Sequence, residues 1–385
     1  MNRMSRPQFP MQERVPQELP PLDHRGRSER VRSRLETSSF ITADPANIRW
    51  LTGFTGSTAW AVVLPDRVVL VTDGRYADRA SADVAGAGVE DEVEVAVEDS
   101  QPAMRDHVVR LASGLGAVGA EAARLTHARW TDLAEHLPLV AADGAVESER
   151  RVKDTAELAR IAHACRIADA ALAVVAPRLG DGLTETDVHD ELEHLMRQMG
   201  ADGPSYDTIV ASGPVHAARP HHGAVRRTIV PGDTVVIDVG ALVDGYHSDM
   251  TRSYVIGVPQ PLQQEWYDLV LAAQLAGLEV VGPGVASREV DAACRQVFDE
   301  AGVGEWFVHA SGHGVGLVIH EEPFHARTSE AELVVGDVVT VEPGLYRAGF
   351  GGFRVEDLVE VTAHGHRILT HSPKDAPCLP SPPTI

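Results

Sequence analysis

The stretch HASGHGVGLVIHEEP places three histidines, His309, His313 and His320, in one short glycine-rich run. Imidazole binds metal ions and changes its charge near neutral pH, so such histidines can act as ligands or transfer protons. Glycines flank His313 on both sides, which lets the backbone and the imidazole approach a site closely. A lone histidine is more often a hydrogen-bonded core or surface residue, but three in one loop favour a functional site.

A second candidate group is the pair of aspartates in VVIDVGALVDGYHSDMTRSYVIG. Asp244-Gly245 is a strong two-residue turn signal and predicts a hairpin in which Asp238 lies opposite Thr251. Asp238 and Asp249 are then diagonal neighbours on one face, about 7–8 Å apart at the backbone. Two like charges on a mostly buried face are costly, and a cation between them removes that cost. The alternative, one aspartate in solvent and one capping a turn, is about equally compatible with the hairpin.

Two glutamates follow in later strand-like segments. Glu342 stands after the apolar run of VVTVEPGLY, where its neighbours are expected to be buried on both sides. In GFRVEDLVEV the alternation puts Arg354, Glu356 and Glu360 on one face of a strand. Taken by itself, this second segment favours a half-exposed strand with ordinary surface charges.

These segments together supply four carboxylates and one imidazole, from Asp238, Asp249, His313, Glu342 and Glu356. Hard oxygen donors with one nitrogen suit Mn²⁺, Co²⁺, Zn²⁺ or Fe²⁺ better than thiophilic metals. Five such side chains exceed what one zinc ion normally takes. The set therefore predicts two divalent ions roughly 3.5–4 Å apart, which activate a water for hydrolysis.

Composition narrows the classes of protein to consider. The chain has 385 residues, and its Lys+Arg total of 34 against 56 Asp+Glu gives a net charge of −22. Such acidity argues against a nucleic-acid or anionic-membrane partner. The three cysteines are far apart, which fits a reducing compartment and predicts a cytoplasmic protein. No apolar run approaches the ~20 residues of a membrane span.

The chain length and the pattern of elements predict two domains between two loose ends. Residues 1–37 are rich in Arg, Pro and Gln and are expected to form a disordered extension. Residues 38–150 alternate strand-like and helix-like segments, which predicts an α/β domain. Residues 151–375 group helices with antiparallel strands, which predicts an α+β domain. Residues 376–385 are expected to form a flexible tail.

The motifs IDVGA, GYHSDMTR, HASGHGVGLVIHEEP, TVEPGLY and GFRVED occur in that order. In this order they resemble the creatinase/prolidase/aminopeptidase P group of pita-bread metallopeptidases, over roughly residues 38–375. The segment NIRWLTGFTGSTAWAVVLPDRVVLVTDGRY is similar to the creatinase-type N-terminal domain of that group. The resemblance implies a pita-bread catalytic domain preceded by a smaller α/β domain, and a homodimer.

The resemblance also implies roles for the five candidate ligands. Asp238 and Asp249 would bind the first ion, and Asp249 would bridge to the second. His313 and Glu342 would complete the second site. Glu356 would bridge both ions.

Four further residues receive roles from the same resemblance. His320 would stabilise the tetrahedral intermediate or transfer a proton. His221, in RPHHG, matches a histidine on the substrate side, and His309 matches another histidine near the site. Arg354 would hold Glu356 in place.

The activity implied is that of an Xaa-Pro aminopeptidase, which cleaves between an N-terminal residue and proline in short peptides. Two divalent ions, foremost Mn²⁺, would be its cofactors. An alternative is an Xaa-Pro dipeptidase (prolidase) restricted to dipeptides. A metal-independent creatinase-like hydrolase and a non-catalytic pita-bread binding module are disfavoured by the intact ligand set. Val215 stands where many relatives carry Asn or another small polar residue, a difference that either changes contacts near the substrate amine or reflects drift.

Overall fold

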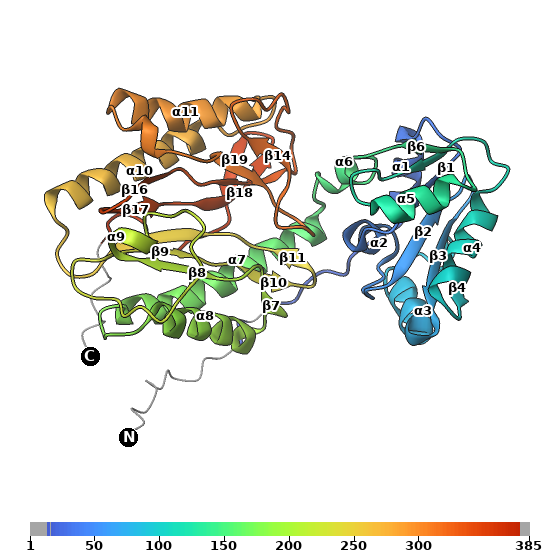
Figure 1. Cartoon of the computed structure of the whole chain (residues 1–385), viewed down its shortest axis with the longest axis horizontal. Coiled ribbons are helices and arrows are strands. Elements are labelled where there is room, and N and C mark those ends of the chain that lie inside the picture. The colour runs from blue at the N-terminus through green and yellow to red at the C-terminus, as the bar shows by residue number, and fades with distance from the viewer. Residues whose placement is uncertain (1–13, 16, 378–385) are drawn as a thin grey trace, which may run out of the picture. The chain divides into compact units, whose positions relative to one another are not determined.

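The computed structural model describes residues 14, 15 and 17–377, which form two compact units (Figure 1). Residues 20–152 make the smaller unit, and the remaining described residues make the larger one. The division falls between Val152 and Lys153, close to the domain boundary expected at residue 150. Among the described residues, no helix is both long and apolar enough to cross a membrane.

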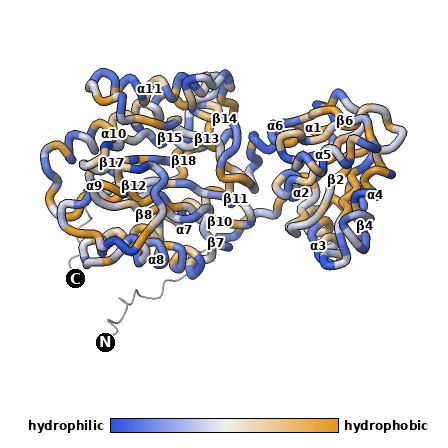
Figure 2. The backbone as a smooth tube through the Cα atoms, in the orientation of Figure 1, coloured by the Kyte–Doolittle hydropathy of each residue, from blue (hydrophilic) through white to orange (hydrophobic). Residues whose placement is uncertain are grey.

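The smaller unit is built on a six-stranded sheet with the strand order β4-β3-β2-β1-β5-β6. Its strands are β1 (Ser39–Thr42), β2 (Ala59–Val63), β3 (Val68–Asp73), β4 (Val93–Glu98), β5 (Val118–Ala120) and β6 (Leu139–Ala141). Its helices are α1 (Arg27–Arg34), α2 (Pro45–Thr52), α3 (Ala77–Gly86), α4 (Gln101–Ala112), α5 (His127–Ala134), α6 (Glu147–Arg150) and the 3₁₀ turn η1 (Gly74–Tyr76). Strand β3 is buried at every position, and Figure 2 shows hydrophobic residues gathered along the strands of this unit. A central strand covered on both faces needs such a continuous apolar run.

The predicted disorder of residues 1–37 is wrong for part of that range. Residues 27–34 form α1, and the Arg27 guanidinium lies 4.8 Å from the ring centre of Trp50 and donates to its carbonyl at 3.1 Å. Stacking on an aromatic face lets an arginine-rich segment bury its charged side chains. The Val15 amide also donates to the Met199 carbonyl at 3.0 Å. Residues 1–13 and 16 of the predicted extension lie outside the described residues. Residues 378–385 of the predicted tail also lie outside them.

The larger unit contains several small sheets, with the orders β12-β9-β8, β11-β10-β7, β14-β13-β15-β18-β19 and β16-β17. The strands of its first half are β7 (Gly203–Pro204), β8 (Ile209–Ser212), β9 (Thr234–Asp238), β10 (Ala241–Val243), β11 (Tyr246–His247) and β12 (Thr251–Val255). Those of its second half are β13 (Gly312–Gly314), β14 (Glu321–His325), β15 (Val338–Val341), β16 (Gly344–Arg347), β17 (Gly351–Arg354), β18 (Asp357–Thr362) and β19 (Gly365–Ile368). The described helices are α7 (Thr155–Val175), α8 (Glu185–Met199), α9 (Gly213–His216), α10 (Pro261–Val280), α11 (Ser287–Glu300) and the 3₁₀ turns η2 (Ala176–Arg178) and η3 (Gly304–Trp306).

Two pairs of helices enclose these strands. Helices α7 and α8 share one apolar core with β8, β9 and β12, and α10 and α11 share another with β15, β17 and β18 (Figure 1). Helix α7 begins at the predicted cap, where Asp154 accepts from the amide of Glu157 at 2.9 Å and Glu157 accepts from the amide of Asp154 at 2.8 Å. Such a capping box satisfies amides that have no partner within the helix.

The hairpin predicted around Asp244-Gly245 is confirmed in its register but divided between two sheets. Both turn residues have positive φ, 47° and 74°, as a two-residue hairpin turn requires. Asp238 is the Cα partner of Thr251 in the β9–β12 ladder, as predicted. Strands β10 and β11, nearer the turn, join β7 instead, so the ribbon changes sheet between Asp238 and the turn. This change of sheet places Asp249 in a loop.

Candidate metal centre

The structure brings the five predicted ligands together in the larger unit. One donor atom each of Asp249, His313 and Glu356 lies within 4.8 Å of the other two. The Nε2 atom of His313 is 3.5 Å from Asp249 Oδ2 and 3.6 Å from Glu342 Oε1. Asp238, at the end of β9, joins the group through a shared hydrogen-bond donor. Asp238 ends β9, His313 is the middle residue of β13, and the other three lie in loops next to strands, so only the tertiary fold can assemble them.

The shared donor is Tyr206, which the sequence analysis did not single out. Its hydroxyl donates to Asp238 Oδ1 and lies 2.5 Å from Asp249 Oδ1. A hydroxyl carries one proton, so it can donate to only one of the two carboxylates at a time. Tyr206 stands in the polar run SYDT, without a spacing pattern that would mark it.

Burial sets the electrostatics of this group. It raises the pKa of Asp249 and of Glu356 well above the usual carboxyl range, and the neighbouring carboxylates raise both further. Burial also raises the pKa of Glu342 to about 7. Desolvation disfavours the anion in each case, and a cation among these oxygens would reverse the effect. The donor set therefore fits divalent metal ions.

His313 has the form that a metal ligand needs. Burial lowers its pKa to about 4, so the imidazole is neutral at neutral pH. Its Nδ1–H donates to the Gly314 carbonyl at 3.0 Å, which leaves the lone pair of Nε2 facing the carboxylates. The flanking glycines are required by space, because a Cβ on Gly312 would lie 2.0 Å from the Thr340 carbonyl oxygen.

Arg354 has a different direct partner from the one predicted. It was expected to hold Glu356, but its Nη2 donates to Asp238 at 2.6 Å. Its Nε donates to the Thr251 hydroxyl at 2.8 Å, which in turn donates to Glu356 at 2.7 Å. Arg354 therefore reaches Glu356 only through Thr251. The strand expected to be half exposed is buried on this face, with both Arg354 and Glu356 1% exposed.

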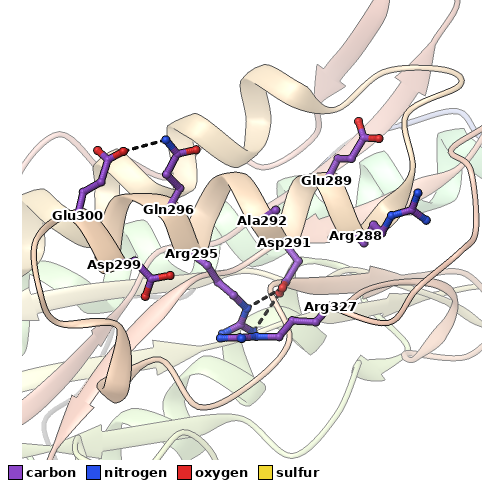
Figure 3. A pocket seen from close by; sticks show the side chains of 9 residues that line it. All are labelled: Arg288, Glu289, Asp291, Ala292, Arg295, Gln296, Asp299, Glu300 and Arg327. Atoms are coloured by element: carbon purple, nitrogen blue, oxygen red, sulfur yellow. Dashed lines mark hydrogen bonds and ion pairs between the residues drawn. The ribbon is translucent and has the colours of Figure 1, made fainter.

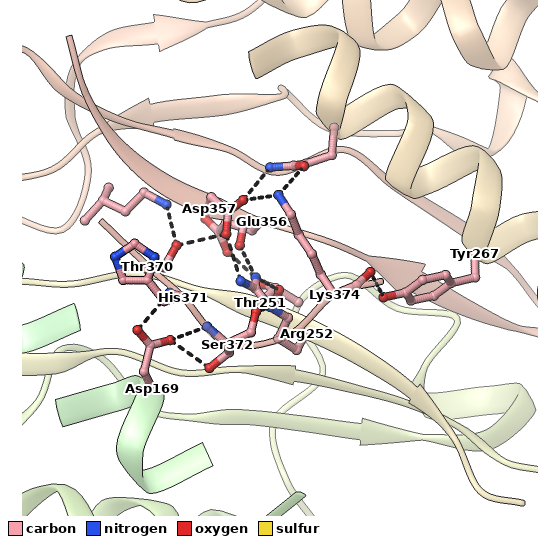
Figure 4. A network of polar contacts seen from close by, with 12 residues as sticks. Asp169, Thr251, Arg252, Tyr267, Glu356, Asp357, Thr370, His371, Ser372 and Lys374 are labelled. Atoms are coloured by element: carbon pink, nitrogen blue, oxygen red, sulfur yellow. Dashed lines mark hydrogen bonds and ion pairs between the residues drawn. The ribbon is translucent and has the colours of Figure 1, made fainter. Parts of the chain in front are cut away.

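A buried polar network supports the main chain around Glu356 (Figure 4). Arg252 donates to the carbonyls of Glu356 at 2.5 Å and Thr251 at 2.9 Å, and to Asp357 Oδ1 at 2.8 Å. Lys374 donates to the other oxygen of Asp357. Two cations on one buried carboxylate offset the cost of removing it from water. The network thus orients the backbone that carries Glu356.

The three other predicted histidines differ in their surroundings. The ring centre of His320 lies 4.4 Å from that of His313, and His320 is exposed. His221 is also exposed, and partial burial together with Arg354 lowers its pKa. His309 donates from Nδ1 to the Ala310 carbonyl at 2.7 Å. His320 thus lies beside the ligand group, whereas His309 is linked to it indirectly.

The link from His309 to the ligand group runs through Tyr346. The Tyr346 hydroxyl donates to His309 Nε2 at 3.0 Å and accepts from Arg354 Nη1 at 3.0 Å. Burial lowers the pKa of His309 to about 3, so its Nε2 is an acceptor at neutral pH. A chain of hydrogen bonds therefore runs from His309 through Tyr346 and Arg354 to Asp238.

Helix α11 borders a cavity of about 690 Å³ that lies apart from the five ligands (Figure 3). Its lining is charged and consists of Arg288, Glu289, Asp291, Ala292, Arg295, Gln296, Asp299, Glu300 and Arg327. Asp291 pairs with Arg295 at 2.6 Å and accepts from the Ser311 amide at 3.2 Å. Arg295 donates to the His309 carbonyl at 2.5 Å. This pair holds the start of the glycine-rich stretch against α11.

Comparisons with known proteins agree with this architecture. Residues 159–363 match the model of metallopeptidase family M24, and residues 27–152 match the creatinase/prolidase N-terminal domain. An Xaa-Pro dipeptidase of Pyrococcus furiosus is 41% identical over 60% of this chain and 67% of its own length. An Xaa-Pro dipeptidase structure from Bacillus anthracis superposes with a TM-score of 0.87 at 35% identity, covering 93% of this chain and all of that one. An X-Pro aminopeptidase structure from Thermotoga maritima superposes with a TM-score of 0.81 at 30% identity, covering 91% of this chain and 99% of that one.

The predicted resemblance, the two-domain pita-bread architecture and the enzyme class are confirmed by these matches. The relatives bear the dipeptidase name at least as often as the aminopeptidase name, so they favour the alternative prediction over the main one. The larger unit is the pita-bread domain and contains the five candidate ligands, and the smaller unit is the creatinase-type domain. This chain belongs to metallopeptidase family M24.

Proposed function

We propose that this chain is a dinuclear-metal Xaa-Pro dipeptidase, which hydrolyses dipeptides whose second residue is proline. The observation that carries the proposal is the convergence of four carboxylates and one imidazole in a buried group. The names of the relatives support the preference for dipeptides. The aminopeptidase activity remains the second candidate, because a solved X-Pro aminopeptidase is also similar to this chain.

The five ligands would divide between two ions. Asp238 and Asp249 would hold the first, His313 and Glu342 the second, and Asp249 and Glu356 would belong to both. When bound, divalent ions supply an activated water and polarise the carbonyl of the scissile bond. Mn²⁺ is the metal that we expect first, because four of the five donors are hard oxygens.

The chain's own residues would bind the peptide and move protons. His320 is exposed beside His313, so its imidazole can donate to the carbonyl oxygen that gains charge during hydrolysis. Partial burial and Arg354 lower the pKa of His221, which favours the neutral imidazole, and that form can accept a hydrogen bond from the substrate. Proline has no amide hydrogen and a fixed φ, so a site shaped for it discriminates by fit. Homodimer formation and a cytoplasmic location remain predictions.

The test is a peptide panel with chelator-stripped protein and added Mn²⁺, Co²⁺ or Zn²⁺. The panel contains Xaa-Pro, Xaa-Pro-Xaa and Xaa-Ala-Xaa, and His313→Ala is the inactive control. We expect metal-restored cleavage of Xaa-Pro and little cleavage of the other two. Equal turnover of Xaa-Pro-Xaa would assign the aminopeptidase activity instead. Cleavage that survives exhaustive chelation would contradict the metal-dependent proposal.

A further inference from the structure

A buried carboxylate outside the ligand group collects several donors from one distant segment. Glu185, the first residue of α8, is 0% exposed. Its Oε1 accepts from the Ser212 amide at 2.7 Å, from the Ser212 hydroxyl at 2.6 Å and from His216 Nδ1 at 2.9 Å. Its Oε2 accepts from the Val225 amide at 3.2 Å. A fully buried carboxylate with this many donors is a strong and rigid anchor.

These donors stand in one segment, residues 212–225, which contains the short helix α9 and is called the 212–225 loop below. Ser212 and Val225 lie at its two ends, and His216 is the last residue of α9. The Glu185 carboxylate therefore holds the two ends of the loop close together through hydrogen bonds to Ser212 and Val225. Within the loop, the carbonyl of Pro220 accepts from Arg354 Nη1 at 3.0 Å. The next residue is His221, assigned to the substrate side of the site. The loop thus connects the Glu185 anchor to Arg354, which also donates to the candidate ligand Asp238.

Other contacts keep the loop in one place. Arg227, two residues beyond Val225, donates to the Ser212 hydroxyl at 2.6 Å and so links the chain after the loop to its first residue. The Gly349 amide, in the turn between β16 and β17, donates to the carbonyl of Pro214 at 3.0 Å. A Cβ on Gly352 would lie 2.3 Å from the Ala217 carbonyl oxygen, which shows how closely the loop packs on β17.

The same cluster could be read as a metal site. One donor atom each of Glu185, His216 and His222 lies within 4.8 Å of the others, and the two imidazole rings are 4.0 Å apart. However, the carboxylate already accepts from two amides and a hydroxyl, and His216 Nδ1 is directed at it. A cation would have to displace these donors. Hydrogen bonding therefore accounts for Glu185 and His216 without an ion.

We propose that Glu185 is a positioning residue, which fixes the loop so that His221 faces the substrate. The assignment of His221 rests on the proposed function, but the anchoring of the loop does not. Glu185 touches neither the candidate ligands nor the substrate side, so it would act through His221. Removing the anchor is expected to misplace the imidazole, and small displacements of a positioned group are costly for turnover.

The central experiment is a double-mutant cycle between Glu185→Gln and His221→Ala. Glutamine keeps the shape but turns one acceptor oxygen into a donor, which would face donors already present. We expect Glu185→Gln to lower kcat/KM for Xaa-Pro roughly 10- to 100-fold with an unchanged content of bound Mn²⁺. In the His221→Ala background the same change should cost less than about twofold, because the residue it acts through is gone. Asp190→Asn, an exposed change on the same helix, is the matched control.

Hydrogen exchange tests the anchor without any assay of activity. The amides of Ser212 and Val225 donate directly to Glu185, so both should exchange faster in Glu185→Gln, whereas residues 234–238 of β9 should not change. If Glu185→Gln does not fold, Ser212→Ala removes only the hydroxyl and should show a smaller effect of the same kind. If no peptide is cleaved by the wild type, the proposed function fails and exchange still decides the anchoring.

Three results would overturn the proposal. Unchanged exchange across residues 212–225 would show that Glu185 does not hold the loop. Full additivity of Glu185→Gln and His221→Ala would show that Glu185 does not act through His221. A third equivalent of Zn²⁺, bound by the wild type and lost in both Glu185→Gln and His222→Asn, would assign the cluster to metal binding instead.

Discussion

Arg354 donates to Asp238 across 2.6 Å, and the two residues are 116 positions apart in the chain. The same guanidinium reaches Glu356 through Thr251 and His309 through Tyr346. A planar fork of donors can serve several acceptors at fixed angles, which a lysine ammonium cannot do. Arg354 therefore contacts the candidate ligand Asp238 directly and the candidate ligand Glu356 through Thr251.

Arg354→Lys is expected to weaken metal binding while the positive charge is kept. The fork to Asp238, Thr251 and Tyr346 is lost, and partners that orient metal ligands are typically worth roughly 10- to 100-fold in affinity. Calorimetric titration of the metal-free protein with Mn²⁺ measures the change in affinity. Arg367→Lys, at an exposed ion pair with Glu360, is the control. Equal Mn²⁺ affinity in Arg354→Lys and wild type would refute the role.

Tyr206→Phe is expected to destabilise the metal-free protein more than the metal-loaded one. The hydroxyl is the neutral donor between Asp238 and Asp249, and losing a buried donor costs about 1–3 kcal/mol. Bound metal would compensate the same carboxylates, so the difference should shrink when Mn²⁺ is added. Urea unfolding with chelator and with excess Mn²⁺ tests this. An identical loss under both conditions would mean that Tyr206 contributes only packing.

His320→Ala is expected to keep its metal and lose most of its turnover. The side chain lies beside His313 and outside the predicted ligand set, so metal content measured by elemental analysis should not change. A positioned acid–base group is typically worth roughly 10²- to 10⁴-fold in rate. Steady-state kinetics on Xaa-Pro gives the ratio. Turnover at the wild-type rate would remove His320 from the mechanism.

The stability of the metal-free protein should depend on pH through the protonation of Glu342. Burial raises the pKa of Glu342 from 4.5 to about 7, so the folded state holds its proton more tightly than the unfolded state does. Its contribution to stability is therefore full below about 4.5 and is lost as the pH rises through about 7. Glu342→Gln should remove this contribution. Urea unfolding of both proteins at pH 5 and pH 8 measures it, and the wild type should lose more stability than the variant.

Metal binding should have the opposite pH dependence and become stronger as the pH rises. Metal binds the carboxylate anion, so protons and metal compete and Mn²⁺ affinity should rise as the pH passes through about 7. Titrations of the wild type with Mn²⁺ at pH 6 and pH 8 test this. Equal affinity at the two values would contradict ligation by carboxylates with raised pKa values.

Features set by neighbouring residues could be predicted from the sequence. The Asp244-Gly245 turn determined the pairing of Asp238 with Thr251, because a two-residue turn leaves only one register. The capping box that starts α7 follows from residue types three positions apart. The ordered motifs also identified the family, since each keeps its chemistry within a few residues of chain.

Burial and long-range partners were decided by the tertiary structure. Alternation in GFRVEDLVEV predicts one exposed face, but Glu356 on that face is 1% exposed, and its carboxylate meets Thr251 and Asp249 from distant parts of the chain. Arg27 of α1 is likewise buried against the ring of Trp50, a partner from another helix. The sequence by itself therefore determined which residues could bind metal and the local turns that carry them. Only the fold decided that they meet, and which cation faces which carboxylate, because those contacts join residues about a hundred positions apart.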